Sequence, residues 1–397
     1  MKKHPYAWVL VGLVLAAAVI SGCGSGSSSS SSASGSESSA SSEGEEASGS
    51  SLEGLKEEVA ALKERPTEIG LTESITKPLP KGGKIDMLVC GVPACGYFVP
   101  YLKEAATAAG WTVKPINEGL TPETVKAAWE QVVRDEPDAV VITGGYPTEI
   151  FQTQLNEVAA KNIPVVDFAN ASTKPGTGEV AIIFGGTRFA NIGKLWARIV
   201  TAESEGKANV LNVYTSTFPS TTVAAEAFDA EIKKICSGCS VEDFNIPATD
   251  VGKEVPQQIA SKVQANPNTD WVVIPITDFE RGVPEALRGV GREPGLGEGQ
   301  VKLLGQDDSI TEMEDIENEE MFGTINLPQS EAMWRAMDIV LRSKLGLPTQ
   351  GSTSLESYKE WLLTKENLPP GIVETVSGSV PGSVEYVAQY KKLWGIE

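Results

Sequence analysis

Short apolar runs alternate with longer amphipathic stretches through most of this chain. The runs cover residues 85–89, 112–116, 139–143, 164–169, 180–184, 209–214, 241–246, 271–276, 301–305 and 324–327. Runs of this length bounded by turn residues are typical of buried strands, and the stretches between them have helical periodicity. Parallel strands joined by helices need crossover connections, which place helices on both faces of the sheet. The alternation therefore predicts an α/β fold with doubly wound parallel sheets.

The alternation restarts near residue 180, which indicates two lobes rather than one long sheet. About 315 residues follow the first 80 or so, which is enough for two domains of ordinary size. In open α/β sheets, ligands bind beyond the carboxyl ends of the strands. Two lobes in tandem place those ends on either side of a cleft, and we expect the functional site there.

The N-terminus has the layout of an export signal. Two lysines precede an apolar run at residues 7–20, which is too short to be a comfortable membrane-spanning helix. The run ends in ISGC at residues 20–23, which resembles the lipobox of bacterial lipoproteins. The resemblance implies a signal peptide at residues 1–22, cleavage before Cys23, and a diacylglycerol group on the Cys23 sulfur that anchors the protein to a membrane. The alternative is an ordinary cleaved signal peptide followed by an incidental cysteine.

A serine-rich stretch separates Cys23 from the rest of the chain. Residues 25–51 hold no large apolar side chain and cannot offset the entropy of ordering. As a flexible coil the stretch would span about 30 Å r.m.s.. Residues 52–62 then have apolar side chains at helical spacing, which fits either a short stalk or a helix docked on the protein. We therefore assign residues 23–80 to a lipidated cysteine, a tether and a short helical stalk.

Charge and histidine content exclude several function classes. The formal net charge is -20, which opposes nucleic acids and anionic lipid surfaces as partners. The one histidine, His4, lies in the predicted signal peptide, so the mature chain has no Ser-His-Asp or Cys-His catalytic set and no histidine-ligated metal. We expect no cofactor, no metal and no enzymatic activity.

Four cysteines follow Cys23, namely Cys90, Cys95, Cys236 and Cys239, and an even number in an exported chain favours disulfides. The spacing does not fix their connectivity. Cys236 and Cys239 also form a CxxC sequence, but it follows a helical pattern, whereas a redox CxxC opens a helix that lowers the thiol pKa. Free thiols, a redox pair and a zinc site built from all four cysteines are the alternatives.

Residues 84–347 resemble the type I periplasmic binding proteins, the ribose-binding and LacI-like group of solute receptors for bacterial ABC importers. The matching segments, in order, are KIDMLVCGVPACGYFVPYLKEAATAAGW, DAVVIT, AAKNIPVVDFAN, VAAEAFDAEI and VKLLGQDDSITEMEDIENEEMFGTIN. The terminal YKKLWGIE is also similar to the ends of exported members. The resemblance implies two lobes joined by a hinge that the chain crosses three times. Residues 81–186 plus 328–347 would form the N-terminal lobe, and 187–327 plus 348–397 the C-terminal lobe.

The strand ends supply the candidate ligand-binding residues, which are Tyr97, Phe98, Tyr146, Asn170, Phe218, Asp278 and Asp307. Asp307 matches the family's ligand-binding aspartate and is the strongest candidate; the alternative is a helix N-cap, a role that Asp308 or Ser309 can also fill. Tyr97 and Phe98 have an alternative role as core residues, and Asp278 as a helix cap.

Other positions depart from the sugar-binding members. Where those members carry an arginine this chain has Ala224, and their asparagine–aspartate pair aligns with Ile276 and Thr277. Their aspartate after the run at 164–169 falls near Ala169. A site built to bind hydroxyl groups discriminates through such polar partners, so their loss indicates a less polar or aromatic-bearing ligand. Arg188 and Arg281 are spare cations for a ligand carboxylate, although an exposed arginine is the commoner case.

The resemblance and the N-terminus together predict a monomeric, lipid-anchored, extracytoplasmic binding protein. It would capture a small solute between its lobes and deliver it to the membrane subunits of an ABC permease. The main alternative is a ligand sensor that signals to a membrane partner. Others are a thiol oxidoreductase using Cys236 and Cys239, a carboxylate-based hydrolase, and a structural cell-surface protein.

Overall fold

The computed structural model describes residues 51–349, 358–369 and 386–396, all within one compact unit that begins at Ser48. The predicted signal peptide, Cys23 and the tether to residue 50 lie outside the described residues. Within the described part of the chain, no helix is long and apolar enough to cross a membrane.

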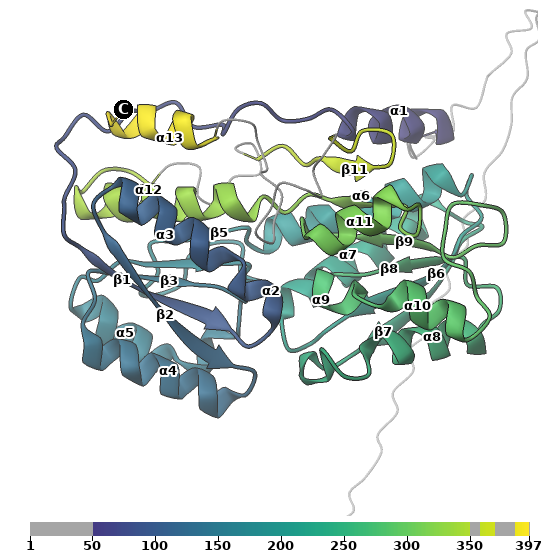
Figure 1. Cartoon of the computed structure of the whole chain (residues 1–397), viewed down its shortest axis with the longest axis horizontal. Coiled ribbons are helices and arrows are strands. Elements are labelled where there is room, and N and C mark those ends of the chain that lie inside the picture. The colour runs from purple at the N-terminus through teal and green to yellow at the C-terminus, as the bar shows by residue number, and fades with distance from the viewer. Residues whose placement is uncertain (1–50, 350–357, 370–385, 397) are drawn as a thin grey trace, which may run out of the picture. The chain divides into compact units, whose positions relative to one another are not determined.

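The first lobe is built on a five-stranded parallel sheet with strand order β2-β1-β3-β4-β5. Its strands are β1 (Lys84–Cys90), β2 (Thr112–Gly119), β3 (Ala139–Ile142), β4 (Val165–Phe168) and β5 (Ala181–Ile183). Its helices are α2 (Pro93–Gly96), α3 (Phe98–Ala108), α4 (Pro122–Asp135) and α5 (Gln152–Ala160), joined by the later α12 (Gln329–Lys344). Figure 1 shows α4 and α5 on one face of the sheet and α3 with α12 on the other. The first lobe is therefore doubly wound, as the alternation predicts.

The second lobe has a six-stranded sheet with strand order β11-β10-β9-β8-β6-β7. Its strands are β6 (Asn209–Tyr214), β7 (Ser240–Asn245), β8 (Trp271–Val273), β9 (Lys302–Gly305), β10 (Gly323–Ile325) and β11 (Leu362–Thr364). Its helices are α6 (Gly186–Glu203), α7 (Pro219–Ile235), α8 (Val255–Ala265), α9 (Thr277–Glu280), α10 (Val283–Gly289) and α11 (Ile310–Glu317). All neighbouring strands pair in parallel except β11, which runs antiparallel to β10 at the edge. The predicted fold class, two α/β lobes with parallel sheets, is confirmed.

Local sequence signals explain where the helices begin and how closely two of them pack. Thr121 caps α4 with Pro122 at its first position, a pairing that preorganises a helix start. Gly193 of α6 faces α7, where a Cβ atom would lie 2.0 Å from the carbonyl oxygen of Ala224. A larger residue there would push the two helices apart, so glycine permits their close contact.

The C-terminal helix α13 (Tyr386–Trp394) packs on α12 and therefore on the first lobe. Its aromatic side chains recur at helical spacing, and the Trp394 ring stacks on Trp334 of α12 with centroids 5.2 Å apart. This differs from the prediction that all of 348–397 belongs to the C-terminal lobe. Only β11 adds to the second sheet, and the burial of the apolar face of α13 returns the chain to the first lobe.

The helix α1 (Leu52–Leu62) docks on α6 of the second lobe. Leu55 and Val59 are buried in that contact, and Glu58 pairs with Arg198 of α6. Of the two alternatives, a stalk and a docked helix, the structure has the docked helix. We call residues 51–80, which include this helix, the strap.

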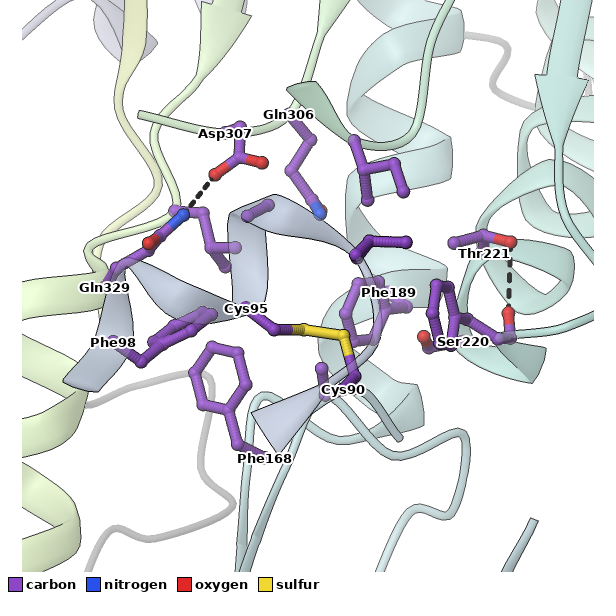
Figure 2. Close-up of a pocket in the computed structure, with 17 residues that line it drawn as sticks. Cys90, Cys95, Phe98, Phe168, Phe189, Ser220, Thr221, Gln306, Asp307 and Gln329 are labelled. Carbon is purple, nitrogen blue, oxygen red and sulfur yellow. Dashed lines mark hydrogen bonds between the residues drawn. A yellow bond between two sulfur atoms is a disulfide. The ribbon is translucent and has the colours of Figure 1, made fainter. Parts of the chain in front are cut away.

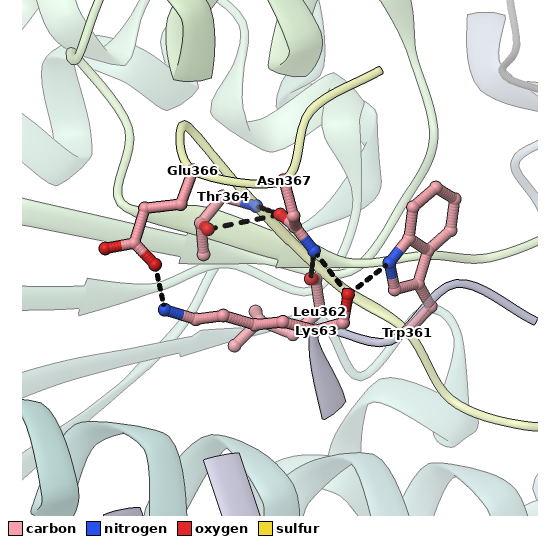
Figure 3. A network of polar contacts seen from close by, with 6 residues as sticks. All are labelled: Lys63, Trp361, Leu362, Thr364, Glu366 and Asn367. Carbon is pink, nitrogen blue, oxygen red and sulfur yellow. Dashed lines mark hydrogen bonds and ion pairs between the residues drawn. The ribbon is translucent and has the colours of Figure 1, made fainter. Parts of the chain in front are cut away.

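The strap is fixed to the second lobe at Lys63, as Figure 3 shows. The Lys63 carbonyl oxygen accepts hydrogen bonds from Trp361 Nε1 (3.3 Å) and Asn367 Nδ2 (2.9 Å), beside β11. Its ammonium group pairs with Glu366 at 2.6 Å. These contacts hold the end of α1 against the turn that follows β11.

The strap then runs over the first lobe, along α12 and α13 (Figure 1). The Ile69 carbonyl accepts a hydrogen bond from Arg335 of α12, and the Ile75 N–H donates to the Leu393 carbonyl of α13 at 2.7 Å. Both isoleucine side chains are buried. The strap therefore joins the two lobes. It does so in addition to the three hinge crossings that the family resemblance implies and to the return of the chain from β11 to α13.

Candidate functional site

A pocket lies where the carboxyl ends of strands from both lobes face each other (Figure 2). It is lined by Cys90, Val92, Ala94, Cys95, Phe98, Gly144, Phe168, Ala169, Phe189, Phe218, Ser220, Thr221, Ile276, Gln306, Asp307, Leu327 and Gln329. The cavity has a volume of about 60 Å³, and the whole space reaches about 530 Å³ when its open mouth is counted. A solute the size of a sugar ring therefore enters only when the lobes move apart.

Four phenylalanine rings form the apolar walls of the pocket. Phe98 and Phe168 come from the first lobe and pack edge to face, with ring centroids 4.7 Å apart. Phe189 of α6 and Phe218 at the start of α7 come from the second lobe. Because all four side chains are buried, the pocket offers a solute aromatic surface from both lobes.

The sulfur atoms of Cys90 and Cys95 lie at disulfide-bonding distance and form part of the pocket wall (Figure 2). Cys90 ends β1 and Cys95 lies in α2, so the bridge closes the short loop that leads into this helix. Cys236 and Cys239 form a second pair at bonding distance between α7 and β7, and neither lines the pocket. In each lobe, therefore, a cysteine pairs with the cysteine nearest to it in the sequence. The spacing of the four cysteines alone did not determine this connectivity.

Asp307 lies on the polar side of the pocket, two residues after the last residue of β9. Its Oδ1 accepts hydrogen bonds from Gln329 Nε2 (2.5 Å) and from the Asp308 N–H (3.0 Å), and its Oδ2 accepts one from the Thr277 N–H (3.2 Å). Burial raises the pKa of Asp307 to about 6. The N-cap of α11 is Ser309, which forms a capping box with Glu312. Asp307 is therefore not the helix cap, and its side chain faces the pocket.

The pocket also contains polar residues that the sequence reasoning missed. Gln306 directly follows β9 and precedes Asp307, and Gln329 begins α12 where the chain returns to the first lobe. Ser220 and Thr221 lie in the first turn of α7. Gln306 could have been predicted from the sequence, because it follows the same strand as Asp307. Gln329 had none, since its place depends on the hinge crossing.

Of the seven candidates, Phe98, Phe218 and Asp307 line the pocket and the other four do not. Asn170 bonds to Asp167 (2.6 Å) and to the Ser172 N–H, which keeps its side chain within the first lobe. Tyr146 follows Gly144 and Gly145, whose positive φ angles turn the chain, and its hydroxyl donates to the Gly119 carbonyl at 2.5 Å.

Tyr97 and Asp278 connect the lobes at the edge of the pocket instead of lining it. The Asp278 carboxylate of α9 accepts a hydrogen bond from the Ala94 N–H of α2 at 2.8 Å. The Arg281 guanidinium donates to the Tyr97 hydroxyl at 2.8 Å. Both bonds run from the second lobe to the first, so they stabilise the closed arrangement.

Arg188 is buried, in contrast to the exposed position that is usual for arginine. It pairs with Glu360 at 2.7 Å, donates to the Asn326 carbonyl, and lies over the Phe184 ring. The Arg281 guanidinium is bonded to Tyr97, as above. Neither arginine lines the pocket, and no lysine or arginine among the described residues does.

The buried carboxyl groups predict how the stability of the fold depends on pH. Burial raises the pKa of Asp86 to about 6 and raises the pKa values of Glu118, Glu280 and Glu312 well above the usual range. Between the ordinary pKa near 4 and the raised pKa, the folded state binds more protons than the unfolded state, so stability falls as pH rises through that window.

We therefore expect a higher melting temperature at pH 5 than at pH 7.5, measured by circular dichroism. The exposed acids with lowered pKa values, Glu123 and Asp135, act only below this window. The variant Asp86→Asn should reduce the difference between the two pH values. A melting temperature that is lower at pH 5 would contradict the expectation.

Comparison with known proteins places this geometry in a family. A model of the periplasmic binding protein domain matches residues 97–346, more than half of the chain. The glucose–galactose binding protein GanP from Geobacillus stearothermophilus has a similar structure, with a TM-score of 0.61 and 17% identity over 73% of this chain and 100% of that one. A carbohydrate transporter from Acidothermus cellulolyticus 11B, solved with myo-inositol, matches with a TM-score of 0.60 and 18% identity over 72% of this chain and 96% of that one. A galactofuranose binding protein matches with a TM-score of 0.61 and 17% identity over 73% of this chain and 96% of that one.

At such low identities these structures establish the fold, and no curated protein sequence is similar enough to match. The family match covers most of both lobes and the pocket-lining residues from Phe98 to Gln329, and it begins after β1 and α2. Members of this family are extracytoplasmic solute-binding proteins rather than enzymes. The chain therefore belongs to the periplasmic binding protein family.

Proposed function

We propose that this protein captures a small solute between its lobes and delivers it to the membrane subunits of an ABC permease. The observation that carries the proposal is a pocket lined by side chains of both lobes at their strand ends. A solute in such a pocket contacts both lobes at once, so it binds the closed form more tightly than the open form. That difference in affinity drives closure, and the permease recognises the closed shape.

The interlobe bonds support this mechanism. Asp278 and Arg281 of the second lobe bond to Ala94 and Tyr97 of the first beside the pocket. Opening breaks both bonds, and the solute restores them by bringing the lobes together. Binding energy is thus the sum of contacts inside the pocket and contacts at its rim.

The same proposal includes a lipid anchor on Cys23, which rests on the ISGC sequence and the serine-rich stretch after it. Cys23→Ser should move the full-length protein from the membrane fraction to the soluble fraction of the producing bacterium. Cys239→Ser serves as the control and should leave the distribution unchanged. Equal membrane association of the Cys23→Ser variant and the wild type would contradict the anchor.

The solute is tested by thermal melting of a soluble form that begins at Ser51 and so keeps the strap. The protein is denatured and refolded first to remove carried ligand. The panel holds sugars, polyols, amino acids, nucleosides, small amines and aromatic acids. A solute at 100 times its Kd adds about 2.7 kcal/mol of stability, and we expect one chemical class to raise the melting temperature. A folded protein that responds to no class would oppose solute capture and favour a sensor of protein partners.

A further inference from the structure

The pocket contains an uncompensated negative charge. Asp307 is the one ionisable side chain in its described lining, apart from the bridged cysteines. Arg188 is paired with Glu360, and Arg281 is bonded to Tyr97 and does not line the pocket. The segments at 350–357 and 370–385 contain no lysine or arginine in their sequence. An anionic solute would therefore meet a carboxylate without a cation to offset it.

Three acceptor oxygens on the polar side of the pocket have capacity for a donor. Asp307 Oδ2 accepts one hydrogen bond, from the Thr277 N–H, and a carboxylate oxygen can accept two. The side-chain oxygens of Gln306 and Gln329 are buried and have no hydrogen-bond partner. Figure 2 shows the Gln306 side chain projecting from the end of its strand toward the pocket with its amide nitrogen foremost, so a half-turn of the amide brings the unpartnered oxygen to that place. Buried acceptors without partners cost free energy, so a solute that supplies donors relieves that cost.

Apart from the hydroxyl groups of Ser220 and Thr221 in the first turn of α7, the remaining walls are apolar and aromatic. The four phenylalanine rings and the Cys90–Cys95 bridge offer no hydrogen-bond partner comparable to the amide and carboxylate groups opposite. A polyol with hydroxyl groups around its whole circumference would bury several of them against these rings unpaired. The faces of aromatic rings, in contrast, attract a cation within about 6 Å of their centroids.

We propose that the solute is a small organic amine, bound in its protonated form, with an apolar or aromatic body. Its ammonium group lies against Asp307, Gln306 and Gln329, where three N–H donors meet three acceptors, and its body lies among the four phenylalanine rings. This inference rests on the proposed function and specifies its substrate class. It differs from the sugars and myo-inositol named for the proteins of similar fold.

Three probes of similar shape and different charge test this assignment: phenethylamine, 2-phenylethanol and phenylacetate. Calorimetry at pH 7.5 measures their binding to the refolded protein that begins at Ser51, with glucose and myo-inositol for comparison. We expect phenethylamine to bind at least tenfold more tightly than 2-phenylethanol, and phenylacetate not to bind. Equal affinity for the amine and the alcohol, or measurable binding of phenylacetate, would overturn the inference.

Two variants examine the residues directly. Asp307→Asn keeps the size of the side chain and removes its charge, so it should abolish the preference for the amine over the alcohol. Gln306→Leu removes one acceptor and should weaken the binding of phenethylamine more than the binding of 2-phenylethanol. This variant provides a second test if Asp307→Asn does not fold. Asp270→Asn, at the opposite end of β8 from the pocket, is the control and should leave the preference intact. An unchanged preference in both pocket variants would remove these residues from amine recognition.

The outcome also separates this inference from the proposed function. Binding of glucose or myo-inositol without binding of phenethylamine would refute the amine and leave solute capture standing. Absence of binding by every probe, with no response in the melting panel, would count against both.

Discussion

Leu55→Ala in the strap is expected to lower the free energy of unfolding by about 2–4 kcal/mol, because removal of a buried leucine side chain loses its transfer energy and leaves a cavity. Leu55 is 1% exposed between α1 and α6. Leu52→Ala on the same helix is the matched control, since Leu52 is 38% exposed and its truncation should cost little. Urea unfolding followed by circular dichroism measures both variants.

Removal of the strap extends the same prediction. A chain that begins at Lys81 loses four buried aliphatic side chains, Leu55, Val59, Ile69 and Ile75, and exposes the surfaces that they cover. We expect it to melt well below the chain that begins at Ser51. Equal melting temperatures, together with equal effects of Leu55→Ala and Leu52→Ala, would show that the strap does not dock in solution.

Asp307→Ala is expected to weaken binding of the cognate solute about 100-fold, measured by calorimetry. The substitution removes a charged partner from the pocket and leaves Gln329 and two backbone N–H groups without their acceptor. Loss of a charged hydrogen-bonding partner in a buried site costs about 3 kcal/mol, which corresponds to roughly that change in affinity.

The control for this variant is Asp270→Ala. Asp270 also accepts a backbone hydrogen bond, from the Asn209 N–H at 2.7 Å, but it lies at the end of β8 away from the pocket. The Asp270→Ala variant should lose some stability and keep its affinity for the cognate solute. Asp307→Ala should remain folded, as judged by its circular dichroism spectrum. An affinity unchanged by Asp307→Ala would remove this residue from the binding site.

The elements of the fold could be predicted because strands and helices depend on local pattern. The apolar runs that become β3 and β4 are bounded by turn residues, and Asp307 follows β9 at the edge where the lobes meet. Parallel topology then brings strand ends together without further information. Phe98, Phe218 and Asp307, which the strand ends suggested, line one cavity, and their role in binding stays a prediction.

The remaining features depend on contacts between segments far apart in the sequence. Tyr146 lies outside the pocket, since two glycines with positive φ turn the chain just before it. Asp278 accepts a hydrogen bond from Ala94 in the other lobe. Gln329 reaches the pocket through a hinge crossing. The docking of α13 on α12 results from aromatic packing between residues such as Trp334 and Trp394. No local pattern contains these pairings, so they needed the structure.

Solute-driven closure of the two lobes is the central claim, and small-angle X-ray scattering tests it most directly. The refolded protein that begins at Ser51 would be measured alone and with a saturating amount of the solute that raises its melting temperature most. We predict a smaller radius of gyration with solute, because the lobes close and restore the bonds at Asp278 and Arg281. A solute that binds by calorimetry while the radius of gyration stays the same would contradict capture by closure.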